Sequence, residues 1–299
     1  MPRLAVKSRF AIRRQPRVYG TMGSLEVRLA RTGSDVRRAQ RLRFQVFYNE
    51  MSAVPDRSAR MQRRDIDSYD SVCDHLLVLD HGSVHRRLFP SPFRKTRRPR
   101  VVGTYRMLRQ DVAEQFSGFY TQKEFDLAPL IAARGAGCRI MELGRSCVLQ
   151  PYRNRRTIEL LWHGLWTYVR EHKISVMVGC ASFEGTTPEA HAQALSFLHH
   201  NVLAPEEWRV SAHNHLRVDM DRIPAHKIKP REVLKALPPL IKGYLRLGCF
   251  VGDGAVVDPQ FGTTDVLMIL PVEKIDPRYF AHFGAPDEHQ VQPGGNIPG

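Results

Sequence analysis

The sequence predicts an α/β sandwich, in which helices cover both faces of a β-sheet. Short apolar runs alternate with segments whose apolar residues recur every three or four positions, and this alternation is typical of layered α/β domains. The clearest helix covers residues 154–173. Apolar runs at 75–79, 100–108 and 140–149 predict the core strands of the sheet.

The other elements are expected in order around this core. Ser34 is a good N-cap for a helix that carries Arg43 and Phe47 one turn apart, so that both can face one cleft. The remaining expected elements are a strand at 25–30, a polar loop over 49–69, a buried strand at 174–180, a helix from 188 to 200, a strand at 208–212, a helix at 231–247 bent by Pro238 and Pro239 and ended by Gly248, and a strand at 265–270.

Composition predicts one globular domain with basic extensions. The chain has 299 residues, of which 42% are hydrophobic, and this suffices for a substantial core. We expect a basic flexible arm at 1–23, a single domain at 24–284 with a basic insert at about 81–99, and a disordered, Pro- and Gly-rich tail at 285–299.

The charge balance points to polyanionic partners. Lys and Arg number 45 against 30 Asp and Glu, which gives a formal net charge of +15. Anionic membrane, nucleic acid or an acidic carrier protein would fit this charge, although solvated loops without a partner fit it equally. Because the sequence lacks zinc-finger spacing, an RNA-binding aromatic signature and a heptad basic region, we expect no nucleic acid partner.

Cysteine spacing and hydropathy indicate a cytoplasmic protein. The five cysteines have no paired spacing, and the basic N-terminus lacks an apolar signal core. No run approaches the roughly 20 apolar residues of a membrane span. We therefore expect any membrane contact to be peripheral, at the inner face. The histidines form no cluster with metal-ligand spacing, so no metal is expected.

Glu142 and Arg145 interrupt an otherwise apolar strand, and this is the strongest sign of a site. Burying a charge in a strand costs several kcal/mol unless the charge is paired or used. A structural ion pair between these two residues is the alternative. Since residues three apart alternate to opposite faces of a strand, that pair would require a β-bulge.

Charged residues upstream complete a pattern that resembles the acyl-homoserine-lactone autoinducer synthases, a branch of the GNAT acyltransferases. Those synthases also carry a tryptophan shortly after the phenylalanine matched here, whereas residues 48–55 contain none. The matched residues are, in order, Arg43, Phe47, Asp67, Asp70, Arg106, Glu142 and Arg145.

The wider chain is similar to a neighbouring branch, the bacterial L-ornithine Nα-acyltransferases of ornithine-lipid biosynthesis. This resemblance implies a GNAT-like mixed twisted sheet, splayed at the central strand, with a thioester arm in the gap. It also implies transfer of a 3-hydroxyacyl chain from acyl carrier protein to the α-amine of L-ornithine, giving lyso-ornithine lipid. The similar stretches are residues 74–80, 142–147, 153–164, 237–248 and 261–267.

The chemistry of amide formation and charge complementarity suggest roles for the residues of the acceptor site. Amide formation requires a neutral amine, so Glu142 is the expected base, directly or through one water, with a pKa raised by its apolar strand. An arginine, Arg43, Arg106 or Arg145, would bind the carboxylate of the amino acid, and Asp67 with Asp70 would bind its second ammonium. The alternative for these aspartates is capping of a turn.

The donor is expected next to the strand end. Backbone N–H groups between Ser146 and residue 149, including those of Cys147 and Val148, would stabilise the oxyanion. The following turn resembles the glycine-rich turn that wraps a pyrophosphate in acetyl-CoA-using relatives, but Asn154 and Arg156 replace its glycines. We therefore expect an acyl-phosphopantetheine thioester on an acidic carrier protein as co-substrate, with no covalently bound cofactor.

Arg153, Arg155 and Arg156 are the residues expected to dock the carrier protein, unless they form only a basic first helical turn. Cys147 is expected to be a core residue, because no histidine partner is suggested for a nucleophile.

Other functions fit part of the sequence. An autoinducer-like synthase acting on S-adenosylmethionine is one alternative, and a non-enzymatic basic adaptor that binds membranes or nucleic acid is another. His75 and Asp80 have the spacing of the glycerolipid acyltransferase motif, but their opposite parity in a strand disfavours convergence on one hydroxyl.

Overall fold

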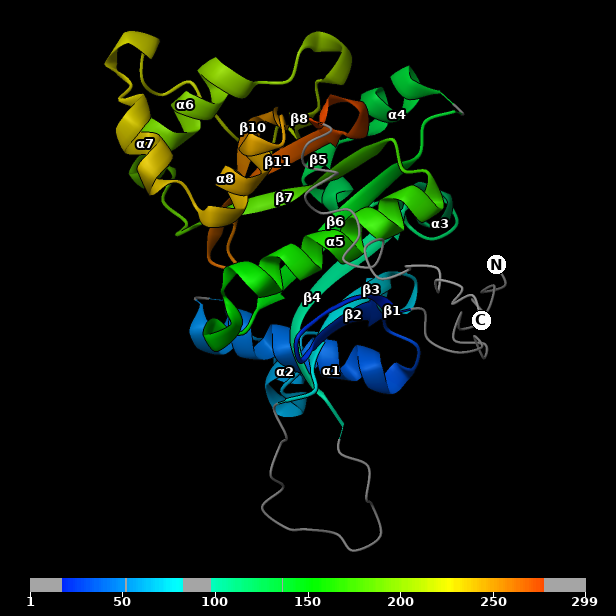
Figure 1. Ribbon diagram of the computed structural model, residues 1–299. Helices are drawn as coiled ribbons and strands as arrows, with labels where there is room; N and C mark the ends of the chain where they lie inside the picture. Colours follow the sequence, from blue (N-terminus) through cyan, green and yellow to red (C-terminus); the bar gives the residue numbers. More distant parts are fainter. Residues whose placement is uncertain (1–17, 52, 83–97, 136, 277–299) are drawn as a thin grey trace, which may run out of the picture.

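A mixed, twisted β-sheet runs through the computed structural model, which describes residues 18–51, 53–82, 98–135 and 137–276 (Figure 1). The strand order is β1-β2-β3-β4-β6-β7-β11-β10-β8-β5, and β9 pairs with β10. The strands are β1 (Val18–Met22), β2 (Leu25–Leu29), β3 (Asp74–Asp80), β4 (Arg100–Arg109), β5 (Phe125–Asp126), β6 (Ile140–Val148), β7 (Val176–Glu184), β8 (Ser211–Ala212), β9 (Arg217–Val218), β10 (Phe250–Asp258) and β11 (Thr263–Pro271).

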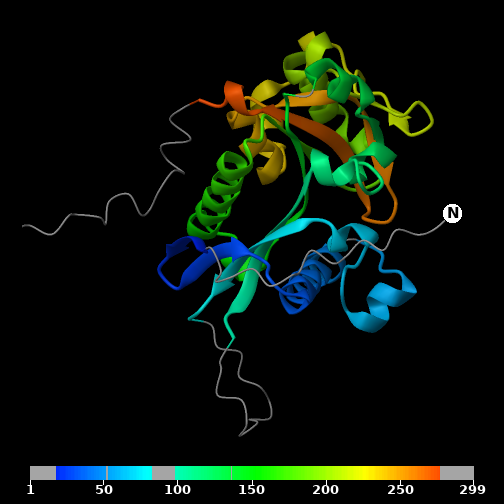
Figure 2. The ribbon, with the colours of Figure 1, turned by 90° about the vertical axis from the view of Figure 1, so that its right-hand side faces the viewer.

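Helices cover both faces of the sheet, as expected. The amphipathic helix α5 packs on β1 to β4, and α1 packs on β3, β4 and β6 from the other side (Figure 2). The helices are α1 (Gly33–Phe44), α2 (Arg57–Gln62), α3 (Gln110–Ala113), α4 (Ala128–Arg134), α5 (Arg155–His172), α6 (Ala192–Val202), α7 (Pro230–Ala236) and α8 (Pro239–Arg246), with a π-helix η1 (Gln45–Glu50) that continues α1.

Short 3₁₀ helices connect these elements: η2 (Ser68–Ser71), η3 (Tyr120–Lys123), η4 (Gln150–Tyr152), η5 (Pro188–His191), η6 (Glu206–Trp208), η7 (Ala225–Lys227) and η8 (Val272–Lys274). Among the helices of the described ranges, none is both long enough and apolar enough to cross a membrane.

The sheet splits between β6 and β7, which confirms the predicted splay at the strand that holds Glu142. These parallel strands pair only from Ile140 to Glu142, opposite Val176 to Val178, and then diverge. Gly179 lies just after the last pair, and a Cβ atom there would stand 2.2 Å from the Leu143 carbonyl oxygen. A side chain at this position would therefore force the two strands apart at their point of closest approach.

A β-bulge in β6 follows the split. The register between β4 and β6 shifts so that two residues, Arg145 and Ser146, face the single residue Tyr105. Arg145 has a φ of 51°, a left-handed conformation that is strained for a residue with a Cβ atom. The bulge turns the guanidinium of Arg145 away from Glu142 and toward the loop before β3.

Several sequence expectations require correction. Residues 18–22 of the predicted arm form β1, because they pair antiparallel with β2. The N-cap of α1 is Thr32, whose side chain accepts a hydrogen bond from the Asp35 N–H, and not Ser34. The predicted loop 49–69 contains α2, and the helix predicted at 231–247 is divided into α7 and α8 before Pro239.

Two further strands differ from the prediction, and three predicted segments lie wholly or largely outside the described residues. The strand β10 was not predicted, and the strand expected at 208–212 shortens to the two residues of β8. Residues 1–17, most of the basic insert (83–97) and the tail 285–299 lie outside the described residues.

Candidate active site

A cavity of about 990 Å³ lies where β6 and β7 diverge. Its walls come from both halves of the split sheet, from η1, from the start of α5 and from α8. Polar residues of β6, β7, β11 and η3 contribute to the lining, and so do aromatic and aliphatic residues of α5 and α8. The cavity thus offers both polar and apolar surface, with Glu142 among its lining residues.

Glu142 is held rigidly at the vertex of the split. Only 5% of the residue is exposed, and three neutral donors bind its carboxylate. The Tyr120 N–H donates to Oε2 at 2.7 Å, while the Thr121 N–H donates to Oε1 at 2.8 Å and the Thr121 hydroxyl donates to the same atom. Burial raises the pKa of Glu142, although these hydrogen bonds offset part of the rise.

The predicted alternative of a Glu142–Arg145 ion pair does not occur. The Arg145 guanidinium pairs instead with Asp65 at 3.2 Å and Asp67 at 3.4 Å. It lies between the rings of Tyr120 and Phe261, at 4.8 and 4.5 Å from their centroids. Arg145 also lines the cavity.

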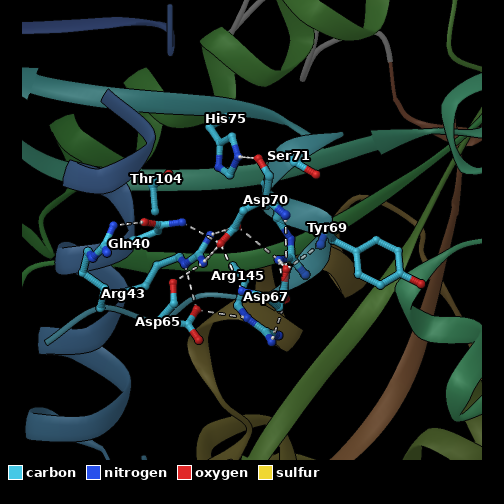
Figure 3. Close-up of polar contacts among 12 residues, drawn as sticks. Gln40, Arg43, Asp65, Asp67, Tyr69, Asp70, Ser71, His75, Thr104 and Arg145 are labelled. Carbon is cyan, nitrogen blue, oxygen red and sulfur yellow. Dashed lines mark hydrogen bonds and ion pairs between the residues drawn. The ribbon is translucent and has the colours of Figure 1, made fainter. Parts of the chain in front are cut away.

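Arg43 belongs to a buried ion-pair network behind the cavity (Figure 3). It is 1% exposed and pairs with Asp65 at 2.8 Å and with Asp70 at 2.7 Å. Burial alone would raise the pKa of Asp70, but the guanidinium groups of Arg43 and Arg106 hold it well below its usual value. Arg43 and Asp70 are not among the cavity-lining residues, so the structure does not support direct substrate binding by either.

Asp67 also differs from its predicted role. It caps η2, where its side chain accepts from the N–H groups of Tyr69 and Asp70, and it pairs with Arg106 at 2.6 Å. The alternative prediction, in which the aspartates cap a turn, is confirmed by this capping box. A carboxylate already bound to an arginine has little attraction left for a substrate cation, so the ammonium site must be sought elsewhere.

The substrate-facing predictions that do reach the cavity are Phe47, Arg106 and Arg145. Phe47 packs edge-on against Phe261, with their ring centroids 5.8 Å apart. Arg106 lies over Tyr120, with its guanidinium carbon 5.3 Å from the ring centroid. These three residues form the part of the cavity wall between Glu142 and the loop before β3.

Aromatic side chains form much of the apolar lining of the cavity. Trp162 of α5 packs edge-on against Tyr244 of α8, with 5.7 Å between ring centroids. The Tyr244 and Tyr105 hydroxyls lie 3.3 Å apart, and Tyr105 also hydrogen-bonds to Ser146. This apolar lining suits a long apolar chain and includes a few hydroxyl groups.

The residues predicted to bind the donor lie at the start of α5, and they differ in their interactions with the rest of the protein. Asn154 is the N-cap and accepts from the Thr157 N–H at 3.1 Å, while Arg153 donates to the Val148 carbonyl and pairs with Glu50. Arg155, whose side chain is 78% exposed, pairs with Glu159 one helical turn away. Arg156 is exposed. Arg153 is exposed as well, so a partner can reach all three arginines, although Arg153 is also bound to the Val148 carbonyl and to Glu50.

Val148 has the geometry expected of an oxyanion donor. The Leu149 N–H is committed to the Val102 carbonyl of β4, whereas the Val148 carbonyl accepts from Arg153. Since a strand residue directs its N–H and C=O to the same side, the Val148 N–H points away from β4 and toward the gap. Cys147 is buried, and burial raises its pKa to about 12, which fits a core residue better than a nucleophile.

Glu124, Cys180 and Asp265 also line the cavity, and sequence reasoning did not select them. A signal for Asp265 was present, because it is a charged residue within the apolar run of β11, as Glu142 is in β6. Glu124 follows η3 in an irregular segment without any periodic pattern, so only the tertiary structure brings it to the site.

His75 and Asp80 do not form a catalytic pair. The His75 ring hydrogen-bonds to the Asp70 carbonyl at 3.0 Å (Figure 3), and burial lowers its pKa. Asp80 accepts instead from Ser24 and Tyr152. Their separation agrees with the expectation that this motif match is accidental.

Comparison with known proteins defines the class of the protein. A family model described as Acetyltransferase (GNAT) domain matches residues 42–163, which run from the end of α1 through β3, β4 and β6 to the middle of α5. With its split sheet, bulged β6 strand and cavity at the split, the protein is a GNAT-type acyltransferase.

Sequence relatives identify the family to which the protein belongs within this class. The chain is 52% identical over 268 residues to the L-ornithine N(alpha)-acyltransferase of Rhizobium meliloti (strain 1021), covering 90% of this chain and 87% of that protein. It is 50% identical over 271 residues to the enzyme of the same description from Agrobacterium fabrum, covering 91% and 89%. The chain therefore belongs to the L-ornithine N(alpha)-acyltransferase family.

Among solved structures, the chain is similar to an N-acyl amino acid synthase from uncultured soil microbes. The identity is 11%, the TM-score is 0.46, and the match covers 90% of this chain and 96% of that chain.

Proposed function

We propose that this protein transfers a 3-hydroxyacyl chain from an acyl carrier protein thioester to the α-amine of L-ornithine, giving lyso-ornithine lipid. The observation that carries the proposal is the buried Glu142 carboxylate, which lines a large cavity at the vertex of the split sheet. The relatives at 52% and 50% identity are described as acting on L-ornithine, which supports the choice of acceptor.

Glu142 is the general base in this proposal. Its Oε2 atom accepts one hydrogen bond in the protein, from Tyr120, so a lone pair remains for the amine or for a bridging water. The raised pKa makes this carboxylate a stronger base than an exposed glutamate. Glu142 first takes a proton from the α-ammonium, and the neutral amine nitrogen then bonds to the thioester carbonyl carbon. The nitrogen gives up a second proton as the amide forms, and this proton goes to the leaving sulfur.

The tetrahedral intermediate then collapses to products. The carbonyl oxygen carries a negative charge in this intermediate, and the Val148 N–H faces the gap where that oxygen would lie. When the C–S bond breaks, the sulfur leaves as the pantetheine thiol with a proton, and the nitrogen retains the acyl group as an amide. No oxidant or further reactant is consumed.

The donor and its acyl chain fit the remaining parts of the cavity. The apolar lining from α5 and α8 suits the acyl chain, and the Tyr105 and Tyr244 hydroxyls offer partners to a 3-hydroxyl group. Arg155 and Arg156, together with the exposed Arg246 at the cavity mouth, suit an acidic carrier protein. This charge is the reason to favour the carrier protein over coenzyme A as donor.

We further propose a cytoplasmic protein that works at the inner face of the membrane, because its product is a lipid and its formal net charge of +15 favours anionic surfaces. The basic segments expected to make this contact lie largely outside the described residues.

The direct test supplies purified protein with a 3-hydroxyacyl-carrier thioester and a panel of amino acids, with products identified by mass spectrometry. We expect the acyl amide of L-ornithine, formed faster from the carrier thioester than from the same acyl chain on coenzyme A. A lactone formed only with S-adenosylmethionine would support the autoinducer-like alternative. Absence of acylated ornithine with either donor would refute the proposal.

A further inference from the structure

Two cavity carboxylates, Glu124 and Asp265, lack the arginine partners that neutralise the aspartates around Arg43. Neither forms an ion pair with any residue in the described ranges. With the Cys180 thiol they form a compact group whose polar atoms all lie within 4.8 Å of one another. Burial raises the pKa of both carboxylates, and Arg145 exerts a smaller, opposing electrostatic effect on each, so a cation of the protein balances the pair only in part.

Asp265 carries the clearest sign of a missing partner. It is 7% exposed, and its Oδ1 atom has no hydrogen-bond partner in the described structure. Burial raises its pKa, and nearby hydroxyls of Thr263 and Ser182 offset part of this rise. Burial, and then the neighbouring Asp265, raise the pKa of Glu124 to about 7. An oxygen buried without a partner is costly unless a ligand completes it.

The carboxylate pair is connected to the base through a short chain of contacts. Thr121 donates two hydrogen bonds to Glu142, and its hydroxyl lies 4.0 Å from the Cys180 sulfur. The Cys180 thiol in turn donates to Glu124 Oε2 at 3.3 Å. Thr121 and Cys180 thus link the pair to Glu142, and all three carboxylates line the same cavity.

We propose that Glu124 and Asp265 bind the side-chain ammonium of a basic amino-acid acceptor and so select L-ornithine over neutral amino acids. This inference rests on the proposed function and replaces Asp67 and Asp70 as the ammonium site. An ammonium group has three donors, which match the unpartnered Asp265 oxygen and the remaining lone pairs of Glu124.

The charges around the cavity give the acceptor one orientation. Arg145 and Arg106 line the cavity and pair with Asp67 of the loop before β3, whereas Glu124 and Asp265, which also line the cavity, form no ion pair within the described residues. With the α-amine at Glu142, the α-carboxylate faces Arg145 and the side-chain ammonium faces the pair. A neutral side chain in that position would leave two buried carboxylates only partly balanced by a counter-charge.

An ammonium fits this group better than a divalent metal. A metal ligand set with cysteine requires the thiolate, but burial and then the Glu124 charge raise the pKa of Cys180 well above its usual value. The thiol instead donates its hydrogen to Glu124. A metal ion would therefore find only the two carboxylates as ligands. An ammonium group would find a hydrogen-bond acceptor for each of its three hydrogens.

The test compares L-ornithine with L-norvaline, which has the same carbon chain without the side-chain amine. The quantity measured is the ratio of kcat/KM for the two acceptors, using the 3-hydroxyacyl-carrier thioester, in wild type, Glu124→Gln and Asp265→Asn. We expect each substitution to lower this ratio by about 30-fold or more, chiefly through a higher KM for ornithine. Glu206→Gln, an exposed change outside the cavity lining, is the matched control.

The outcomes separate this inference from the proposed function. If wild type acylates no amino acid, the proposed function fails. If wild type acylates ornithine and both folded variants keep the wild-type preference over norvaline, the ammonium site is wrong. Loss of wild-type activity on treatment with a chelator, together with a stoichiometric metal in the purified protein, would also overturn it. Far-ultraviolet circular dichroism and thermal unfolding establish that each variant is folded.

Discussion

Two acidic clusters lie on either side of the cavity, and they differ in what neutralises them. Asp65, Asp67 and Asp70 are paired with Arg43, Arg106 and Arg145. Glu124 and Asp265, across the gap, have no such partners among the described residues, and burial raises the pKa of each. Burial is similar on the two sides, so the difference is one of pairing.

This difference indicates which charges serve the fold and which serve the substrate. The arginine network anchors the loop before β3 to α1 and to the bulge of β6, and it holds Arg145 in its strained conformation. The unpaired carboxylates, with Glu142 between the two regions, contribute no such support. We infer that they are retained for the ligand, because leaving them charged and unpaired lowers stability.

The largest expected effect comes from removing the centre of the paired network. Arg43→Met leaves Asp65 and Asp70 buried with fewer counter-charges and should lower the free energy of unfolding by about 3–5 kcal/mol. Chemical denaturation at neutral pH measures this loss. Arg41→Met, an exposed change on the same helix, should have little effect. Equal effects of the two substitutions would show that the network is not the support we describe.

The same network makes a prediction about pH. Arg43 and Arg106 hold the pKa of Asp70 below its unfolded value, against the effect of burial, so the stabilisation is present above about pH 4 and is lost as the pH falls. The stability difference between wild type and Arg43→Met should therefore shrink in acid. A difference that stays constant down to the acid transition would contradict this part of the account.

A contrast among arginines at the donor end sharpens the comparison. Arg153, Arg155 and Arg156 are all exposed. Arg153 is bound to the Val148 carbonyl and to Glu50 across the protein, whereas Arg155 pairs with Glu159 of its own helix. The double change Arg155→Glu and Arg156→Glu should raise KM for the acyl-carrier thioester about tenfold and weaken its salt dependence. The acyl-pantetheine thioester alone should react as with wild type. Arg231→Glu on α7, outside the cavity lining, is the control, and an unchanged salt slope in the double variant would refute the contact.

The smallest effect concerns stability on the unpaired side. The pKa of Glu124 is raised to about 7 in the folded protein, so its ionisation destabilises the fold as the pH rises from about 4 toward that value. Glu124→Gln should raise the free energy of unfolding above neutral pH by an amount on the order of 1 kcal/mol, and by less in acid. A clear loss of stability in this variant would mean that Glu124 supports the fold.

The sequence predicted the core of the fold because its signals there are local. The apolar runs of β3, β4 and β6 and the periodicity of α5 each depend on a short stretch of chain. The strand β10 was missed because Gly252, Asp253 and Gly254 interrupt its apolar pattern. The two-residue strand β8 has no pattern long enough to detect.

The site was only partly predictable for a related reason. A charge inside an apolar strand identified Glu142 and Arg145, but sequence cannot say whether aspartates and arginines bind each other or a substrate. Asp70 and Arg43 are 27 residues apart, and only the fold shows that they meet. The same limit explains why Glu124, in an irregular segment, was not selected.

Replacing Glu142 tests the central claim most directly, namely that an unpaired, buried carboxylate at the split of the sheet removes the proton of the acceptor amine. In Glu142→Gln, we expect kcat for acylation of ornithine to fall by about 10²-fold or more, with KM for ornithine little changed. The acid limb of the wild-type pH profile, displaced upward by the raised pKa of Glu142, should disappear. A folded Glu142→Gln protein that turns over at the wild-type rate with the same acid limb would contradict the account.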